Sequence, residues 1–366
     1  MIGFWISIVM LCFTGLVQIF IPYMLKKTVV FGVTIPASHI EDKLVIQAKK
    51  IYSIAIASIW LLFLVGYSIW SILVIHSEDL QVIVGTALMF LLMIVSMLFY
   101  AFFHQKLRVK KQQQQWGANL TEVKVVDTSL RGQDEMMPLS YFISLAFVPL
   151  ILIIYTYYQY ALLPEQIPTH WGPSGEPDAF TEKNRFSVIS LPLVMLVMQA
   201  LFATLTEGTK RSGMKISAIN PQISAHKQLE KRKYTSWFMF LIAFLITILF
   251  SFLQLTTIHH GIVGEGIMLT IFITFIVVTI VGSIIFSVKV SSLEEVGNDS
   301  SFPDSITDVD DDRFWKGGLM YFNKEDPSLF VEKRFGIGWT INFARPMSYL
   351  IVFVPIIIIL LIAFLT

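Results

Sequence analysis

The chain has 366 residues, of which 55% are hydrophobic and 14% are charged, and its mean hydropathy is +0.69. Because about a quarter of the residues in a soluble domain are charged, this composition excludes an ordinary soluble protein and predicts a polytopic membrane protein. The single cysteine, Cys12, excludes an intrachain disulfide and a cysteine-based metal site.

Eight apolar segments are long enough to cross a bilayer, whose hydrocarbon core of about 30 Å needs roughly 20 residues of helix. No basic residues precede the first segment and no small-residue cleavage site follows it, so we expect it to be retained as a helix. The predicted fold class is an all-α integral membrane protein. The predicted spans are residues 2–23, 52–75, 80–103, 140–162, 186–206, 234–257, 265–288 and 347–366.

Lysine and arginine residues are distributed unequally among the predicted loops. Loops 24–51, 104–139, 207–233 and 289–346 contain 5, 6, 7 and 7 of them, whereas loops 76–79, 163–185 and 258–264 contain 0, 2 and 0. Since cytoplasmic loops collect basic residues, the first set is predicted to be cytoplasmic and both termini are predicted to face outside.

The first predicted cytoplasmic loop contains a β-branched run at residues 28–36, which is too short to span a membrane. Ser38 and Glu41 follow it with the spacing of a capping box. We therefore expect a short strand followed by a helix that leads into the membrane.

The second predicted cytoplasmic loop begins with a basic cluster and continues with a possible strand at residues 121–126. We expect the cluster to lie against anionic lipid headgroups. A nucleic-acid partner is not expected, because aromatic residues for base stacking are scarce there. The cluster consists of Lys106, Arg108, Lys110 and Lys111.

The loop before the last span divides into two parts. Residues 291–312 are acidic and rich in Ser and Gly, which predicts a disordered linker. Asp308, Asp310 and Asp312 have the D-x-D-x-D spacing of a calcium loop, but Arg313 stands where such a loop requires glycine, and we reject calcium.

Residues 313–346 are predicted to form a β-rich module, with strands at 315–322 and 330–343 around a turn. The second strand alternates large apolar residues with small or polar ones, which is typical of a strand that lies on another surface. That surface is the membrane, the strand around residues 31–33, or a partner protein.

The predicted outer loop, Leu163–Arg185, is the long polar interruption in the middle of the chain. Its prolines exclude a helix, and its glycines favour turns that fold the chain back on itself. An imidazole, an indole and carboxylates in such a loop favour a recognition or metal-binding surface; the alternative is a rigid interfacial cap. The candidate ligand-binding residues are His170, Trp171, Gly175, Asp178 and Lys183.

The predicted spans contain no Asp, Glu, Lys, Arg or His except Glu265 at one edge, which weakens the case for an ion-coupled transporter. No H-E-x-x-H, P-loop or G-x-S-x-G motif occurs, so we expect no catalysis. Imidazoles and carboxylates of the outer loops could bind zinc, with His170, His259 and His260 as ligands; no other cofactor is expected.

The outer loop carries the motif Ile167-Pro168-x-His170-Trp171-Gly172-x-x-Gly175-x-x-Asp178, followed by Lys183. It resembles that of the bacterial membrane domain of unknown function 1648, which is shared with the SdpI-type immunity proteins of Gram-positive bacteria. The resemblance implies protection against a secreted antimicrobial peptide and sequestration of a cytosolic repressor at the membrane.

Residues 313–346 contain W-x-G-G-x-x-Y-x-N-x-x-D-P and K-R-F-G-x-G-W-T-x-N patterns. They resemble a second domain of unknown function, number 5808, which often ends such proteins. Together the resemblances imply a protein of the cytoplasmic membrane of a Firmicute. The candidate partner-binding residues are Trp315, Tyr321, Asn323, Asp326, Arg334, Trp339 and Asn342.

Three hypotheses follow. The first is a sensor or immunity protein that meets a peptide or envelope ligand outside and holds a cytosolic partner inside. The second is a transporter or transporter subunit, with buried glutamines lining a path, and the third is an outer-face metalloenzyme. The predicted parts are a membrane region (1–139), a helix-loop-helix with the outer motif (140–206), further helices (207–290), the linker (291–312), the module (313–346) and the last span (347–366).

Overall fold

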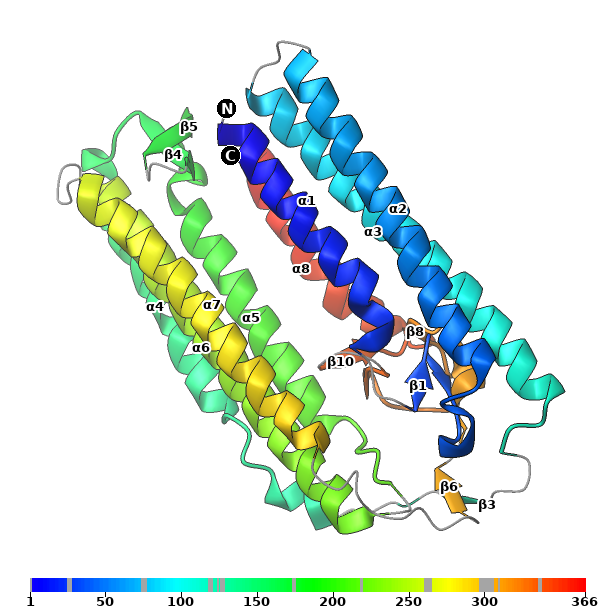
Figure 1. Cartoon of the computed structure of the whole chain (residues 1–366). Helices are drawn as coiled ribbons and strands as arrows, with labels where there is room; N and C mark the ends of the chain where they lie inside the picture. Colours follow the sequence, from blue (N-terminus) through cyan, green and yellow to red (C-terminus); the bar gives the residue numbers. More distant parts are fainter. Residues whose placement is uncertain are drawn as a thin grey trace. The chain divides into compact units, whose positions relative to one another are not determined.

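The computed structural model describes residues 2–24, 28–73, 78–117, 121–123, 125, 129–172, 176–217, 220–259, 265–295, 306–308, 310–334 and 338–366. Within them lie eight helices that are long and apolar enough to cross a membrane (Figure 1). Each coincides with one of the eight predicted spans, so the helical part of the prediction is confirmed. The helices are α1 Ile2–Phe20, α2 Lys43–Leu73, α3 Glu78–Gln113, α4 Leu139–Tyr158, α5 Ser190–Arg211, α6 Pro221–Ile258, α7 Glu265–Glu295 and α8 Pro346–Leu365.

Three of these helices extend well beyond their apolar segments. Helix α2 begins at Lys43, α3 continues to Gln113, and α6 begins at Pro221. The added turns are rich in Lys and Gln, which favour helix, and Pro221 occupies the first helical position, which suits proline. A count of consecutive apolar residues predicts only the apolar part of a helix, and it therefore misses these polar turns at the helix ends.

The predicted capping box is wrong, because helix α2 does not begin near Ser38. Residues Ala37–His39 form a 3-10 turn, and the carbonyl of Asp42 accepts the backbone N–H of Ile46 at 3.1 Å. The Asp42 carboxylate instead pairs with Nδ1 of His39 at 3.0 Å. The other short helical turns are Ile21–Tyr23, Ser129–Gln133, Tyr160–Leu162, Ser187–Ile189 and Asp312–Phe314.

The strands of the described residues form five separate two-stranded sheets. Four are antiparallel hairpins, and the pair of β3 with β6 is parallel. The pairs are β1 Val29–Val30 with β2 Val33–Thr34, β3 Thr121–Val123 with β6 Ile306–Asp308, β4 Gln166–Trp171 with β5 Pro177–Glu182, β7 Trp315–Lys316 with β8 Met320–Tyr321, and β9 Phe330–Glu332 with β10 Trp339–Ile341.

Three predicted single strands are hairpins instead. Residues 28–36 turn back at Phe31 and Gly32, whose φ angles are 48° and 72°. Residues 315–322 turn at Gly317 and Gly318, with φ angles of 59° and 74°, and residues 330–343 form the β9–β10 hairpin, in which Gly338 has a φ of 101°. Positive φ values break a strand, and they are the reason why these segments fold back.

The chain divides into two compact units. Unit 1 comprises Met1–Val123, Asp304–Asn323 and Lys333–Gly336, and unit 2 comprises Lys124–Pro303, Lys324–Glu332 and Ile337–Thr366. The predicted module, residues 313–346, is therefore divided between the two units.

Unit 1 is built on the first three helices. Helix α1 packs against α2 and α3, and the β1–β2 hairpin lies against α3. The turn residue Phe31 is fully buried, with its ring centroid 5.2 to 5.4 Å from those of Tyr52, Tyr100 and Phe103. Its carbonyl lies 2.9 Å from Nδ1 of His104, so the hairpin is fixed to α3 by both apolar and polar contacts.

Unit 2 is a bundle of α4, α5 and α6, with α7 packed on α6 and α8 on α5. Two buried glutamines join its helices. Gln199 donates to the hydroxyl of Thr247 at 2.9 Å, and Gln254 donates to the hydroxyl of Thr156 and the carbonyl of Val188, each at 2.9 Å. In an apolar bundle such bonds hold helices together, which favours a structural role for these glutamines over lining a transport path.

Candidate functional site

The β4–β5 hairpin of the outer motif is held at its base by Lys183. The backbone N–H of this residue donates to the carbonyl of Glu165 at 2.9 Å, and its Nζ donates to the carbonyl of Leu163 at 2.8 Å. The ammonium also lies 5.1 Å from the centroid of the Tyr160 ring. The side chain of Lys183 is only 10% exposed. Its ammonium group is bound to the Leu163 carbonyl and lies near the Tyr160 ring, so Lys183 holds the base of the hairpin in place.

A turn after β5 continues this anchoring. The side-chain oxygen of Asn184 accepts the backbone N–H groups of Phe186 and Ser187 at 2.8 Å, and the Ser187 hydroxyl donates to the carbonyl of Glu182 at 2.9 Å. Below the turn a small apolar cluster closes the base of the hairpin. Its buried members are Leu163, Ile167, Val188, Ile189 and Ile258.

The distal half of the hairpin is open to solvent. His170 Nδ1 lies 2.5 Å from Asp178 Oδ1, and the two side chains are 68% and 51% exposed. Phe180, on the same strand as Asp178, is 53% exposed. Gly172 leaves room for the Asp178 carboxylate, because a Cβ there would lie 2.9 Å from Asp178 Oδ2. The arrangement presents a paired imidazole and carboxylate beside an exposed aromatic ring.

The other candidate metal ligands are not gathered around this pair. His259 Nε2 lies 2.6 Å from the hydroxyl of Tyr155, and His260 and Gly175 lie outside the described residues. No group of three His, Cys, Asp or Glu side chains suited to a metal ion is present in the part of the chain that the structure describes. The zinc site and the metalloenzyme remain predictions from the sequence.

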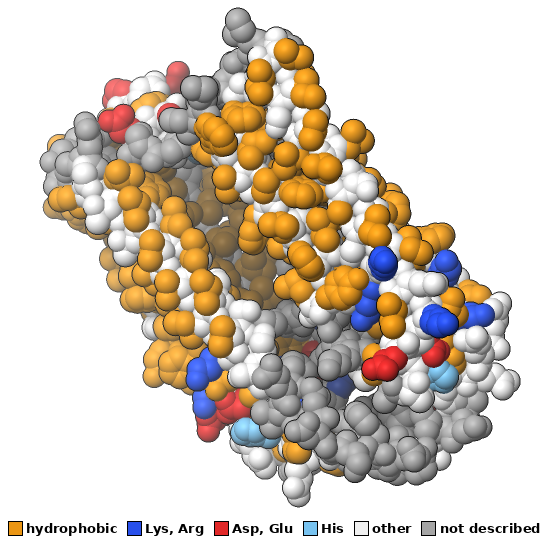
Figure 2. All heavy atoms as spheres, viewed as in Figure 1, with side chains coloured by type: hydrophobic (Ala, Val, Ile, Leu, Met, Phe, Trp, Pro, Cys, Tyr) orange, Lys and Arg blue, Asp and Glu red, His pale blue; other side chains and the backbone are white. Residues whose placement is uncertain are grey.

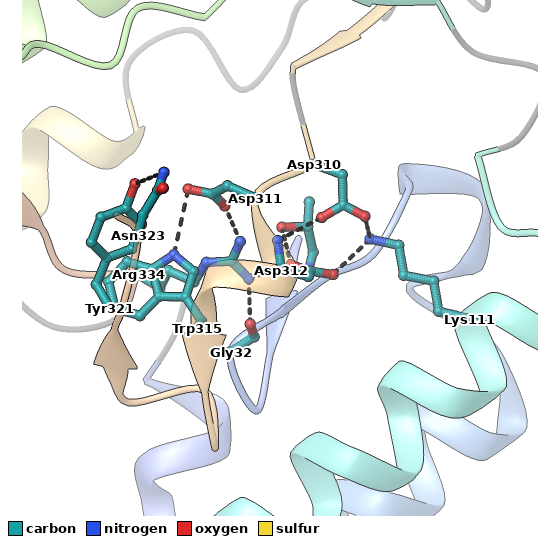
Figure 3. A network of polar contacts seen from close by, with 10 residues as sticks. Gly32, Lys111, Asp310, Asp311, Asp312, Trp315, Tyr321, Asn323 and Arg334 are labelled. Atoms are coloured by element: carbon teal, nitrogen blue, oxygen red, sulfur yellow. Dashed lines mark hydrogen bonds and ion pairs between the residues drawn. The ribbon is translucent and has the colours of Figure 1, made fainter. Parts of the chain in front are cut away.

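A second polar cluster lies within unit 1, where Arg334 joins Asp311 and Asp312 (Figure 3). The two terminal nitrogens of the guanidinium bind one carboxylate each, and Nη1 also donates to the carbonyl of Gly32. The guanidinium carbon lies 5.3 Å from the centroid of the Trp315 ring. Arginine suits this position because its planar fork binds two acceptors while its face stacks on an aromatic ring. We call these residues the Arg334 clasp.

Asp312 is the most heavily bonded member of the clasp. Its Oδ1 also accepts the backbone N–H and the hydroxyl of Thr34, each at 3.1 Å, and its Oδ2 lies 2.7 Å from Lys111 Nζ. Burial by itself would raise the pKa of Asp312, but the charges of Arg334 and Lys111 outweigh burial and hold its pKa below the ordinary value. Burial likewise opposes the charge of Arg334, and the two carboxylates outweigh it and raise the pKa of the guanidinium.

The glycines of two hairpins fit together beside the clasp. A Cβ on Gly32 would lie 2.6 Å from the Cα of Gly318, and a Cβ on Gly318 would lie 2.6 Å from the carbonyl oxygen of Phe31. Only glycine permits this approach of backbone to backbone. The β7–β8 hairpin therefore lies on residues 31–33, one of the three surfaces that were proposed for the strand at residues 330–343.

The unit 2 part of the module has a separate set of contacts. The backbone carbonyl of Asp326 accepts hydrogen bonds from the side-chain amide of Asn342 at 3.0 Å and from Nε of Arg345 at 2.9 Å. Glu332 in β9 lies 3.0 Å from Lys231 Nζ, and the Trp339 ring centroid in β10 lies 6.0 Å from the guanidinium carbon of the buried Arg232. These contacts fasten the β9–β10 hairpin to the start of α6.

Most of the predicted partner-binding residues are therefore engaged within the chain. Trp315, Tyr321, Asn323, Arg334 and Asn342 are 9% exposed or less. Trp339 is half-buried, and the Asp326 backbone is bonded to two side chains. Contacts within the chain explain why these residue types stand at these positions. A partner that docks on the module must therefore contact its other side chains.

Sequence reasoning missed the role of the two clasp carboxylates and the ion pair of Lys111 with Asp312. Asp310 and Asp312 drew attention only through the spacing of a calcium loop, and both instead bind Lys111, at 2.6 and 2.7 Å. The predicted disordered linker is wrong for its last residues, since Asp312 is 4% exposed. The available signal was Arg334 itself, which stands in the K-R-F-G-x-G-W-T-x-N pattern, because an arginine that becomes buried requires an acidic partner.

Two family models match the chain. Residues 147–196 match a domain of unknown function (DUF1648), and residues 324–349 match a family of unknown function (DUF5808). The first match covers the end of α4, the β4–β5 hairpin and the start of α5, and the second covers β9, β10 and the start of α8. Both resemblances and their order along the chain are confirmed. No curated protein and no solved structure matches the chain.

Proposed function

We propose that the chain is a non-catalytic, multi-pass protein of a bacterial cytoplasmic membrane, in which the β4–β5 hairpin recognises a peptide or envelope ligand on the outer face. The eight apolar helices and the match to a membrane domain of unknown function support the membrane location. The excess of basic residues in alternate loops supports the orientation with the hairpin outside.

The observation that carries the recognition role is the contrast between the base and the rest of the hairpin. The base is fixed by Lys183, Asn184 and an apolar cluster, whereas the rest of the hairpin exposes His170, Asp178 and Phe180. A rigid platform with exposed aromatic and charged groups binds a ligand without a large loss of conformational entropy. A merely interfacial cap needs no ordered imidazole–carboxylate pair.

The proposed binding of a cytosolic regulator is assigned to exposed side chains of the module. In the β7–β8 hairpin, Met320 and Phe322 are 46% and 38% exposed, although their neighbours Trp315 and Tyr321 are buried. Apolar side chains held on a rigid hairpin are suited to contact a cytosolic regulator. The proteins that copurify with wild type and with Met320→Ser/Phe322→Ser, identified by mass spectrometry, test this role, and an identical set would exclude these two residues.

The outer role is tested by His170→Ala combined with Trp171→Ala. Cells that express wild type, the double variant or Lys316→Ala, an exposed position in the predicted cytoplasmic module, are challenged with a library of synthetic amphipathic peptides. We expect wild type and Lys316→Ala to raise tolerance to at least one peptide, and the double variant to lose that tolerance at unchanged abundance in the membrane fraction. Equal tolerance in all three strains would refute the proposal.

Direct contact is tested by a photo-crosslinking amino acid in place of Phe180. The control position is Phe147, which is 58% exposed on the apolar surface of α4. Crosslinks of a peptide or envelope component to position 180 and of lipid alone to position 147 are the expected outcome.

A further inference from the structure

A groove between the first turns of α2 and the last turns of α3 has the features of a ligand site. It encloses about 500 Å³ and lies wholly within unit 1. Its walls are largely apolar, with Leu44 and Ile51 on α2 facing Phe102 and Val109 on α3. These four side chains are 36% exposed or more, so they are not covered by other parts of the described chain.

Two ammonium groups border this apolar groove. Lys106 and Lys110 stand one turn apart on α3 and line the groove, and neither forms an ion pair with any described carboxylate. The lining residues include no Asp or Glu, and their other polar members are amides, including Gln47 and Gln105. The groove is thus basic at its edge and apolar on its walls.

A neighbouring hollow of about 460 Å³ lacks this imbalance. It is also in unit 1, but its cations, including Lys111 and Arg313, face the carboxylates of Glu122, Asp310 and Asp312. Lys111 is already bound to two of these carboxylates. Of these two hollows, the α2–α3 groove is therefore the one whose lysines have no carboxylate among the lining residues.

The position of the groove along the helices identifies its occupant. The charge-free segments 52–75 and 80–103 end where the groove begins, at Ile51 on α2 and Phe102 on α3. Figure 2 shows Lys and Arg side chains gathered beyond a broad hydrophobic surface at this end of the two helices. If the charge-free segments lie in the hydrocarbon layer, the two lysines lie at the depth of the lipid phosphates.

We infer that this groove binds one anionic phospholipid, with its phosphate at Lys106 and Lys110 and the start of an acyl chain along Leu44, Ile51 and Phe102. The inference rests on the membrane insertion proposed above. Basic pockets between membrane helices bind anionic headgroups, and each lysine near such a group increases the binding constant about fivefold. Two lysines therefore correspond to a preference of about 30-fold for an anionic over a zwitterionic lipid.

Native mass spectrometry of the full-length protein in detergent tests the site, with phosphatidylglycerol, phosphatidylcholine and inorganic phosphate as separate additions. The test variant is Lys106→Gln/Lys110→Gln, which removes both positive charges and leaves polar side chains. The control is Lys43→Gln/Lys50→Gln, which removes the same charge from two exposed lysines of α2 that do not line the groove. A third variant, Gln47→Trp, fills the groove with its charges intact.

We expect wild type and the control to retain phosphatidylglycerol, and the Lys106/Lys110 variant to lose about 30-fold in apparent affinity. Gln47→Trp should also release the lipid, because the acyl chain loses its groove. Equal retention by the Lys106/Lys110 variant overturns the site, as does equal binding of phosphatidylcholine or binding of inorganic phosphate alone. If the protein is a dimer without lipid and Gln47→Trp dissociates that dimer, the groove binds a second copy of the chain, and the lipid site is also overturned.

Extraction of cell membranes with alkaline carbonate separates this inference from the function on which it rests. If the protein is released with soluble proteins, the membrane location itself fails. If the protein stays in the membrane and binds no anionic lipid, only the inference about the groove fails.

Discussion

Replacing Arg334 with methionine tests whether the clasp holds the β7–β8 hairpin on the β1–β2 hairpin. The side chain is 5% exposed, and it binds Asp311, Asp312 and the carbonyl of Gly32. Methionine fills much of the same space over the Trp315 ring but leaves both carboxylates without the guanidinium. Loss of one partner from a buried ion pair costs about 3 to 5 kcal/mol.

The structure places the cost for Arg334→Met at the lower end of this range. Asp312 keeps Lys111 at 2.7 Å and both bonds from Thr34, and Asp311 is 23% exposed, so water can solvate its carboxylate. We therefore expect the free energy of local opening to fall by about 3 kcal/mol, which corresponds to roughly 150-fold faster amide exchange.

Hydrogen–deuterium exchange of the protein in detergent measures this change at a defined atom. The backbone N–H of Thr34 donates to Asp312, so it becomes exchangeable when the clasp opens. The control is Arg211→Met, because Arg211 is 78% exposed and its pair with Glu207 on one helix contributes only a few tenths of a kcal/mol. Unchanged protection of Thr34 in Arg334→Met would refute the reasoning, and so would an equal effect of Arg211→Met.

The remaining predictions concern pH, the glycine contact and a buried glutamine. Since the folded-state pKa of Asp312 is below its ordinary value, its stabilisation of unit 1 is present above about pH 4 and lost as the pH falls further; thermal melts at pH 6 and pH 3 should therefore differ less for Asp312→Asn than for wild type. Gly32→Ala should lower the melting temperature, because the new Cβ meets the Gly318 backbone at 2.6 Å and φ is 72°, whereas Gly66→Ala in α2 has open space and should be neutral or stabilising. Gln254→Leu removes two interhelical bonds and should destabilise unit 2 by about 1 to 2 kcal/mol, measured by denaturant titration; an unchanged midpoint would show that these bonds contribute nothing.

The helices and the β4–β5 hairpin could be predicted from the sequence because their causes are local. An apolar run of about 20 residues favours a helix long enough to cross a membrane, and all eight runs are helical in the structure. Prolines 164, 168 and 173, with the nearby glycines, exclude a helix and return the chain, and β4 and β5 form the expected fold-back. The exposed pair of His170 and Asp178 was anticipated by residue type, although not the bond between the two side chains.

The clasp could be decided only by the tertiary structure, because its partners are far apart along the chain. Arg334 reaches Gly32 across 302 residues, and Lys111 reaches Asp312 across 201. No periodicity or spacing within a segment connects such positions. They meet because the β7–β8 hairpin packs against α3 and the β1–β2 hairpin. The sequence by itself determined which segments are helical and which loop is exposed, whereas packing determined that the aromatic and charged residues of the module stabilise the chain's own interior.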